Sequence, residues 1–317
     1  MKNLRTQFFY YLKPAIPRFA QLAIRRQVIV GKLDRYAKVW PIDPEAGRPP
    51  ENWGGWPGRK KFALVLTHDV EKQAGQEKVR FLADMERELG FRSSFNFVPE
   101  RYPVSGELRR YLTENDFEVG VHGLNHDGKY FNSREIFWER AARINRYLEE
   151  WGAVGFRMPS MHHRLDWFHD LHIEYDASTF DTDPFEPYPD GVRTIFPFIV
   201  EGESIQKGYV ELPYTLPQDF LLFVILREKN IRIWKEKVDW IVERGGMALF
   251  LVHPDYMNFE GMSLRSDEFP AEYYREILLY IKSRYDGEYW HALPKDVAAH
   301  VRNSAPVNCR RTWQESI

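Results

Sequence analysis

Short apolar runs alternate with amphipathic segments along most of the chain, after a Pro- and Trp-rich connector that ends at residue 58. The runs have the length of buried strands. They are FALVL (62–66), SSFNFV (93–98), FEVGV (117–121), AVGF (153–156), MALFLV (247–252) and EYWHAL (288–293). The segments between them predict helices over 76–89, 105–115, 135–151, 233–245, 272–285 and 294–303. Asn132 and Glu135 form a capping pair that would start the third of these helices.

Repeated strand–helix units indicate parallel strands joined by helical crossovers. This many units predict an irregular (β/α) barrel of about seven parallel strands, over residues 59–305. The alternation lapses between Tyr175 and Phe220, where Pro, Asp and aromatic residues are dense, and we expect long loops there that cover one end of the barrel.

The ends of the chain differ from this core. Residues 1–58 are predicted to form an amphipathic helical extension and the connector, and residues 306–317 a C-terminal tail. Residues 1–30 mix aromatic and basic side chains, which favours a helix packed on the outside of the barrel; the alternative is contact with a membrane surface. No segment has the roughly 18 to 20 apolar residues of a membrane span. We therefore expect a cytoplasmic protein, with the inner face of the membrane as the alternative location.

The overall charge limits the choice of partner. A net charge of -2 and a pI of about 6.6 argue against nucleic acid and favour a neutral or small substrate. Cys309 is the single cysteine, so the chain forms no internal disulfide and any metal must be held by His and carboxylate side chains.

Polar residues of unusual kind follow several predicted strands directly. In a parallel barrel the carboxyl ends of all strands open on one face, where such barrels carry their chemistry, so these residues would meet in space. They are His68, Asp69 and Glu71; His122, His126 and Asp127; Arg157; and His253 and Asp255.

His122 and His126 stand four residues apart, which would place two imidazoles on one side of a helical turn. Such a pair alone is more often an ordinary surface feature. Together with a carboxylate from the first strand end, it would form a three-ligand metal site with positions left for water.

These motifs resemble the NodB-like polysaccharide deacetylases, carbohydrate esterase family 4. That family carries T-F-D-D, H-[ST]-x-x-H, R-x-P and L-x-x-H motifs in this order. The counterparts in this chain are THDVE (67–71), HGLNH (122–126), RMP (157–159) and FLVH (250–253). The resemblance implies a NodB-like barrel and a metal-dependent hydrolase that removes an acetyl group from a sugar.

The chain departs from these motifs at several positions. Gly123 replaces a hydroxyl residue, Phe250 replaces leucine, and Val70 replaces the aspartate that is usually a metal ligand. A variant form of the first motif would move that ligand to Glu71, on the same side of an extended strand as Asp69. If Glu71 points elsewhere, Asp69 would bind the metal and the base would be unassigned.

The resemblance also assigns roles to the matching residues. Glu71, His122 and His126 would hold a divalent metal, with Zn²⁺ favoured by the two imidazoles and Co²⁺ or Ni²⁺ as alternatives. Asp69 would act as base, Arg157 would orient it and keep it ionised, and His253 would protonate the leaving group. Taken singly, Arg157 is equally compatible with an ordinary ion pair and His253 with a satisfied core histidine.

Candidate substrate-binding residues lie in and before the predicted loops. Aromatic rings could stack on sugar faces and carboxylates could bond hydroxyl groups, although a loop that packs its own aromatics is at least as plausible. The candidates are Trp167, Asp181, Asp183 and Tyr214, with Phe180, Phe185 and Tyr188 as further rings.

Three functions fit these observations. The first is a deacetylase that removes an acetyl group, with N-acetyl favoured over O-acetyl, from a sugar or from a nucleotide- or lipid-linked sugar precursor in surface-polysaccharide or lipopolysaccharide biosynthesis. The second is a non-sugar amide hydrolase of the same barrel. The third, motivated by Val70 and by the amphipathic N-terminus, is an inactive relative that binds glycan or anchors an assembly.

Overall fold

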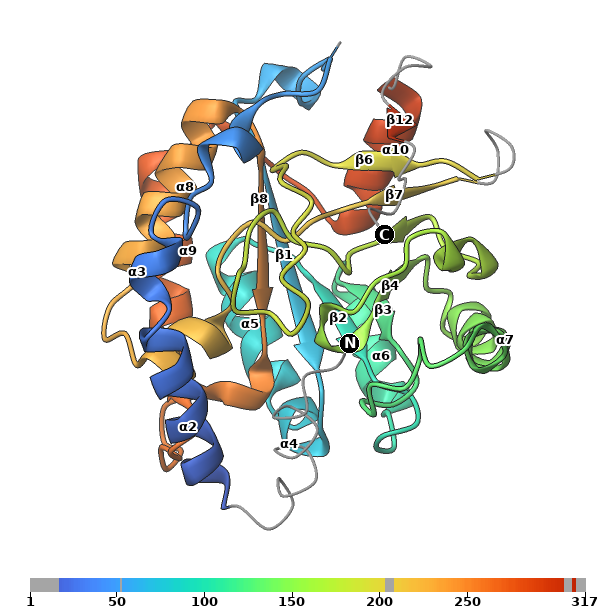
Figure 1. Cartoon of the computed structure of the whole chain (residues 1–317), viewed down its shortest axis with the longest axis horizontal. Coiled ribbons are helices and arrows are strands. Elements are labelled where there is room, and N and C mark those ends of the chain that lie inside the picture. The colour runs from blue at the N-terminus through green and yellow to red at the C-terminus, as the bar shows by residue number, and fades with distance from the viewer. Residues whose placement is uncertain (1–16, 52, 203–207, 305–309, 312–317) are drawn as a thin grey trace.

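A curled, mostly parallel β-sheet forms the centre of the computed structural model (Figure 1), which describes residues 17–51, 53–202, 208–304 and 310–311. The strands are ordered β8-β1-β2-β3-β4-β5-β7, and β11 pairs with the first half of β1. Within the described residues these eight strands run parallel: β1 Phe62–Val70, β2 Ser94–Phe97, β3 Glu118–His122, β4 Gly155–Arg157, β5 Tyr175–Asp176, β7 Tyr209–Glu211, β8 Met247–Val252 and β11 Tyr289–His291.

The sheet curls until its two sides approach each other. Backbone N–H groups of Thr215 and Leu216, just after β7, donate to the Leu249 carbonyl of β8 at 3.1 and 3.3 Å. The predicted irregular (β/α) barrel is thus confirmed, with eight parallel strands in place of about seven.

Side chains alternate strictly along β1. Ala63 and Val65 point into the barrel, while Phe62, Leu64 and Leu66 pack with the surrounding helices. All nine residues of β1 are buried. The strand therefore continues for four residues beyond Leu66, the last residue of the apolar run. Because the period is two, the same alternation sends the polar residues that follow to two different places.

Helices cover the outside of the sheet. In Figure 1, α8 and α9 lie on one side of it and α6 and α7 on the other. The helices are α2 Arg18–Val30, α3 Leu33–Tyr36, α4 Gln73–Gln76, α5 Val79–Leu89, α6 Gly106–Glu114, α7 Arg134–Trp151, the π-helical turn η7 Phe220–Leu226, α8 Arg232–Arg244, α9 Glu272–Arg284 and α10 Pro294–Ser304.

The N-terminal helix α2 packs against η7 at the side of the barrel (Figure 1). Leu22 and Ile29 are its buried residues. Residues 1–16, which carry the rest of the aromatic and basic segment, and Cys309 lie outside the described residues. Within the described ranges, none of the helices is both long and apolar enough to cross a membrane.

Several local predictions need correction. Ser133, not Asn132, caps α7, since its hydroxyl accepts a hydrogen bond from the Ile136 N–H. The region expected to be loops contains the barrel strands β5 and β7, too short to show a periodic pattern, and β6 Phe198–Val200, antiparallel to β7. Two residues of the predicted tail form β12 Arg310–Arg311, which pairs with β6, and a separate two-stranded sheet joins β9 Met257–Asn258 to β10 Phe269–Pro270.

Candidate functional site

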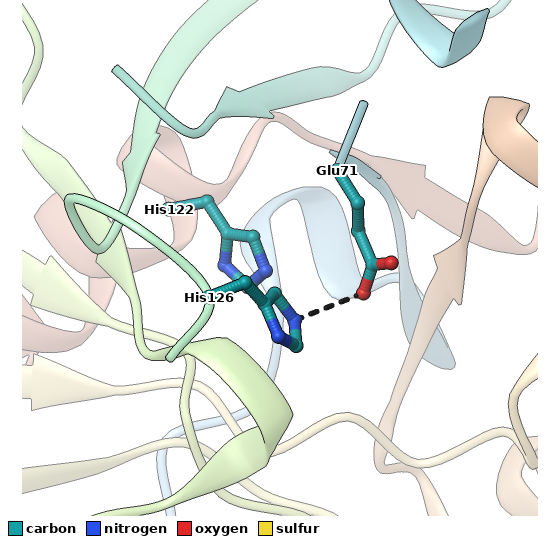
Figure 2. Close-up of side chains that lie close together, drawn as sticks. All are labelled: Glu71, His122 and His126. Carbon is teal, nitrogen blue, oxygen red and sulfur yellow. Dashed lines mark ion pairs between the residues drawn. The ribbon is translucent and has the colours of Figure 1, made fainter. Parts of the chain in front are cut away.

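Three potential metal ligands converge beyond the carboxyl ends of β1 and β3. One nitrogen from each of His122 and His126 and one carboxylate oxygen of Glu71 all lie within 4.8 Å of one another. Figure 2 shows the three side chains turned toward a common point. Such a set of two imidazoles and one carboxylate is typical of catalytic zinc sites, which keep a further position open.

The two histidines are brought together by a loop and not by the helical turn that their spacing predicts. His122 is the last residue of β3, and the chain then bends at Gly123, whose φ is 60°. A Cβ there would lie 2.6 Å from both Pro159 and the Tyr130 hydroxyl, which explains why a serine or threonine does not fit in this chain. The imidazole centroids of His122 and His126 are 5.7 Å apart.

His122 is held in one orientation. Its Nδ1 lies 3.1 Å from the carbonyl oxygen of Arg157, so Nδ1–H donates there and Nε2 keeps its lone pair. Burial lowers the pKa of His122 to about 4, although Asp69 opposes this shift. A neutral imidazole with its free nitrogen directed at the site is the form that binds a metal.

Glu71 reaches the site because β1 continues in extended form. Thr67 and Asp69 face the barrel interior, and Glu71 follows on the same side. Its backbone N–H donates to Asp255 at 2.8 Å, and its carboxylate accepts from the Tyr256 hydroxyl at 3.2 Å. Burial would raise the pKa of Glu71, but His126 and the other nearby imidazoles lower it well below the usual range, so the carboxylate is ionised.

His68, one residue before Asp69, belongs to the other face of β1. Its Nε2 lies 2.8 Å from the buried carboxylate of Glu86, which also accepts from the Tyr274 and Ser93 hydroxyls. It is therefore a core residue, and Val70 is likewise packed among the helices. A metal ligand at position 70 would point away from the site.

The donor set fits a divalent cation. Nε2 of His126 is buried and lies 3.0 Å from Oε1 of Glu71, yet it has no partner in hydrogen-bonding geometry. A buried ring nitrogen left in this way is costly unless a ligand satisfies it. Glu71, His122 and His126 could therefore hold a metal ion between them.

Asp69 and Arg157 form a buried ion pair beside these ligands. Nη1 of Arg157 lies 3.0 Å from Oδ1 of Asp69, and Asn96 donates to the same oxygen at 3.0 Å. Burial would raise the pKa of Asp69, but His122, Arg157 and His253 outweigh it and lower the pKa to about 2. The second oxygen, Oδ2, lies 3.6 Å from Nε2 of His122 and so faces the candidate metal ligands.

His253 follows β8 and faces the same cavity. Its Nδ1 lies 2.7 Å from Oδ1 of Asp219, while Oδ2 of Asp219 accepts from the His253 backbone N–H at 2.8 Å. Burial would lower the pKa of His253, but Asp219, supported by Glu71 and Asp69, raises it to about 10. The ring therefore carries a proton that Nε2 can donate into the cavity.

These side chains border one large cavity of about 1130 Å³. Asp69, Glu71, His122, His126 and His253 line it, and Arg157 lies fully buried behind Asp69. The structure thus brings together all six residues to which sequence motifs assign catalytic or metal-binding roles.

The four predicted substrate-binding residues do not line this cavity. Trp167 packs against Phe131 and Phe137. Asp181 forms a buried ion pair with Lys237 at 2.5 Å. Removing one partner of a buried ion pair typically lowers the free energy of unfolding by about 3 to 5 kcal/mol, so the Asp181–Lys237 pair stabilises the fold.

Asp183 and Tyr214 are also buried, and they bond each other: the Tyr214 hydroxyl lies 3.2 Å from Asp183 and 3.0 Å from Glu186. Their positions do not support the prediction that they contact substrate, because the loop packs its own aromatic residues. Of the rings considered in this loop, Tyr188 alone lines the cavity, and it stacks edge-on with His162.

Sequence reasoning missed several residues that shape the site. Asp219, Asn96 and Tyr256 each hold one of the predicted functional side chains through a hydrogen bond. Asn96 follows the alternation of β2 beside β1 and could have been found from the strand register. Asp219 lies in a loop segment with no periodic pattern, so only its contact with His253 identifies it.

The chain matches no family model and no curated protein. Solved structures do resemble it. One classed as a polysaccharide deacetylase, from Mycobacterium smegmatis, is 17% identical with a TM-score of 0.64, over 82% of this chain and 97% of that chain. Another structure classed in the same way, from Pseudomonas aeruginosa PAO1, is 15% identical with a TM-score of 0.58, and the match covers 83% of this chain and 98% of that chain. An allantoinase is 15% identical with a TM-score of 0.61, and the match covers 85% of this chain and 99% of that chain. These comparisons confirm the resemblance to polysaccharide deacetylases at the level of the fold.

The ligand geometry predicts a metal stoichiometry. Wild-type protein dialysed against Zn²⁺ should retain about one ion per chain by elemental analysis, because one three-ligand site is formed. His126→Ala and Glu71→Ala should each lose most of this zinc. His162→Ala, which removes a cavity histidine outside the ligand set, serves as the control. If the control and both ligand variants retain equal amounts of zinc per chain, Glu71 and His126 are not ligands and the proposed metal site is wrong.

Proposed function

We propose that this chain is a metal-dependent deacetylase that hydrolyses an acetyl group, most readily an N-acetyl group, on a sugar or sugar precursor. The observation that carries the proposal is the meeting of three arrangements in one cavity. They are the Glu71–His122–His126 ligand set, the Asp69–Arg157 pair and the His253–Asp219 pair. Amide hydrolysis needs a polarised carbonyl, a deprotonated water and a protonated leaving nitrogen, and each arrangement supports one of these needs.

A divalent ion held by Glu71, His122 and His126 would polarise the acetyl carbonyl and lower the pKa of water beside it. Asp69 would accept the proton of the attacking water through Oδ2, the oxygen that Arg157 and Asn96 leave free. A carboxylate with so low a pKa is a weak base, so its placement matters more than its basicity. Arg157 fixes that placement by holding Oδ1.

His253 would donate a proton to the departing amine. An amine leaves poorly as an anion, so a positioned acid is needed when the tetrahedral intermediate breaks down. Asp219 keeps the His253 imidazole protonated and, by accepting from Nδ1, directs Nε2 toward the cavity. After the transfer, the neutral ring would be recharged from solvent.

Two features support a sugar substrate over a small non-sugar amide. A cavity of about 1130 Å³ is larger than a compact amide needs. The partly exposed ring of Tyr188 at its wall offers a face on which a sugar could stack. The fold alone does not decide, because the allantoinase is as similar in structure as the deacetylases are.

The inactive-relative alternative arose from Val70. The position of Glu71 in the ligand set supports the active interpretation, because Glu71 supplies the carboxylate that Val70 lacks. A role in surface-polysaccharide or lipopolysaccharide biosynthesis, and a location inside the cell, are parts of the proposal that rest on the motif resemblance.

Peripheral membrane contact through residues 1–30 is a further part of the proposal. The described helix α2 exposes Phe19, Ile24 and Val28, with 66%, 42% and 52% of each residue accessible. Replacing all three by serine should reduce flotation with anionic liposomes, since inserted apolar side chains drive such binding. Unchanged flotation of this variant, or no flotation of wild type, would remove membrane contact from the account.

The hydrolase proposal predicts acetate release that depends on named side chains. Zinc-loaded wild type should release acetate from N-acetylated sugars, and Asp69→Asn and His253→Gln should each lower kcat by about 100-fold or more, the usual contribution of a general base or acid. O-acetylated sugars and allantoin, assayed in parallel, separate ester and non-sugar amide hydrolysis. No acetate from any sugar, with ring opening of allantoin instead, would replace the deacetylase by the second function.

The His253–Asp219 pair predicts a change in the pH profile. Asp219→Asn keeps an acceptor for Nδ1 but removes the negative charge that raises the pKa of His253, so that pKa should fall. Because the protonated ring is the acid, the alkaline limb of kcat/KM should move to lower pH. Asp239→Asn, which alters a carboxylate outside the cavity, should leave the profile unchanged. An alkaline limb that stays in place in Asp219→Asn would exclude His253 as the acid.

A further inference from the structure

Five basic side chains line the cavity although the chain has a net charge of -2. Within the part of the chain that the structure describes, none of the five forms an ion pair within 4.0 Å. They are Arg18, Arg25, Lys72, Arg101 and Lys129. A concentration of like charges without partners is unfavourable by itself and is typical of a site for an anionic ligand.

The acidic residues of the cavity are engaged elsewhere. Asp127 accepts two hydrogen bonds from Arg140, at 2.8 and 2.7 Å. Glu186 is bonded by the Tyr214 hydroxyl and by the Gln218 amide. Asp69 and Glu71 belong to the ion pair and the ligand set described above. Arg25 still acts electrostatically on Glu186, and Lys129 on Asp127, but no ion pair within 4.0 Å ties up any of the five cations in the described ranges.

Three of the cations are connected to the candidate metal site through two aromatic rings. The guanidinium carbons of Arg18 and Arg25 lie 5.8 and 5.1 Å from the centre of the Phe220 ring. Phe220 contacts Tyr256 with ring centroids 4.7 Å apart, and Nζ of Lys72 lies 5.4 Å from the Tyr256 ring. The Tyr256 hydroxyl in turn bonds Glu71, so the cations and the metal ligands share one wall of the cavity.

Buried and basic residues share one stripe of α2. Leu22 and Ile29 are buried and hold the helix, while Arg18 and Arg25, seven residues apart, lie about two turns from each other on one face. Arg26, the next residue along, does not line the cavity. The N-terminal helix therefore carries two guanidinium groups to the cavity, where they also lie over the Phe220 ring of η7.

We propose that Arg18, Arg25 and Lys72 bind a phosphate group carried by the acetylated sugar, so that the substrate is a phosphorylated or diphosphate-linked sugar. Guanidinium groups match phosphate oxygens in bidentate geometry, and several cations match a multiply charged group better than a single carboxylate. This inference rests on the proposed function and names its substrate class. It replaces the neutral substrate that the net charge alone suggested.

Binding and kinetics test the proposal separately. Calorimetry should show that N-acetylglucosamine 1-phosphate binds wild type about tenfold or more tightly than N-acetylglucosamine, the gain expected from hydrogen bonds to a charged group. Arg18→Gln/Arg25→Gln should lose this preference, and for the phosphorylated sugar its KM should rise with little change in kcat. Arg26→Gln should behave as wild type. Raising the salt concentration should weaken binding of the phosphorylated sugar only.

Equal binding of the neutral and phosphorylated sugars by wild type would overturn the proposal, as would a double glutamine variant that keeps the preference. If that variant does not fold, Arg18→Lys/Arg25→Lys, which keeps the positive charges but not the planar guanidinium groups, should retain only part of the preference for the phosphorylated sugar. Arg26→Lys is its control. Full retention of the preference in the double lysine variant would count against a guanidinium site. Phosphate preference without acetate release would instead contradict the proposed function while supporting this inference.

The carrier of the phosphate is identified by two further ligands. Uridine diphosphate N-acetylglucosamine and a short polyprenyl diphosphate N-acetylglucosamine in detergent should each bind more tightly than the neutral sugar if the phosphate is what is recognised. Additional tightening by the nucleotide or by the lipid shows which carrier the rest of the cavity accepts. Failure of both to bind better than the neutral sugar would refute a diphosphate-linked substrate.

Discussion

The site depends on one buried ion pair, between Arg157 of β4 and Asp69 of β1. Both residues are buried, and placing two charges there is favourable only when their geometry and remaining hydrogen bonds are satisfied. Arg157 meets most of this condition: its Nη1 donates to Asp69 and to Thr67 and its Nε to the carbonyl of Ala177 after β5, while the buried Nη2 has no hydrogen-bond partner among the described residues. Its own carbonyl accepts from His122 of β3. One residue thereby fixes the carboxyl ends of several neighbouring strands relative to one another.

Several buried polar groups at the carboxyl ends of the other strands are also paired. Other functional residues near the strand ends are also held by a second polar group: Asp219 holds the His253 side chain and Asp255 holds the backbone of Glu71. In a buried setting an unpaired charge is expensive, so these partners are needed for folding as well as for orientation. The surfaces left free, Oδ2 of Asp69 and the ring nitrogens turned to the cavity, are those that the proposed reaction uses.

Much of this arrangement could be predicted from the sequence, because periodicity is a local property. Repeated strand–helix units were enough to anticipate a parallel barrel, and the motif order, with the period-two alternation that places Glu71 beside Asp69, to gather Glu71, His122 and His126. The contacts made by the irregular segment between Tyr175 and Phe220 could not be predicted in this way. Asp181 and Tyr214 looked available in an irregular segment, but whether a polar residue in a loop faces a cavity or a buried partner depends on contacts distant in sequence.

The role of α2 was out of reach for the same reason. Its composition indicated an amphipathic helix, and a helix of that kind can cover a core, lie on a membrane or line a site. The contact with η7 brings Arg18 and Arg25 over Phe220 and so adds positive charge to a cavity whose other features are those of a hydrolase.

The central claim is that Glu71, His122 and His126 together bind the ion that activates the reaction. X-ray absorption at the zinc edge of the zinc-loaded protein tests it most directly. Two imidazole nitrogens at about 2.0 to 2.1 Å with the remaining ligands oxygen, and one imidazole fewer in His126→Ala, is the result that the account predicts. A spectrum with oxygen ligands alone, or one that His126→Ala leaves unchanged, would contradict it.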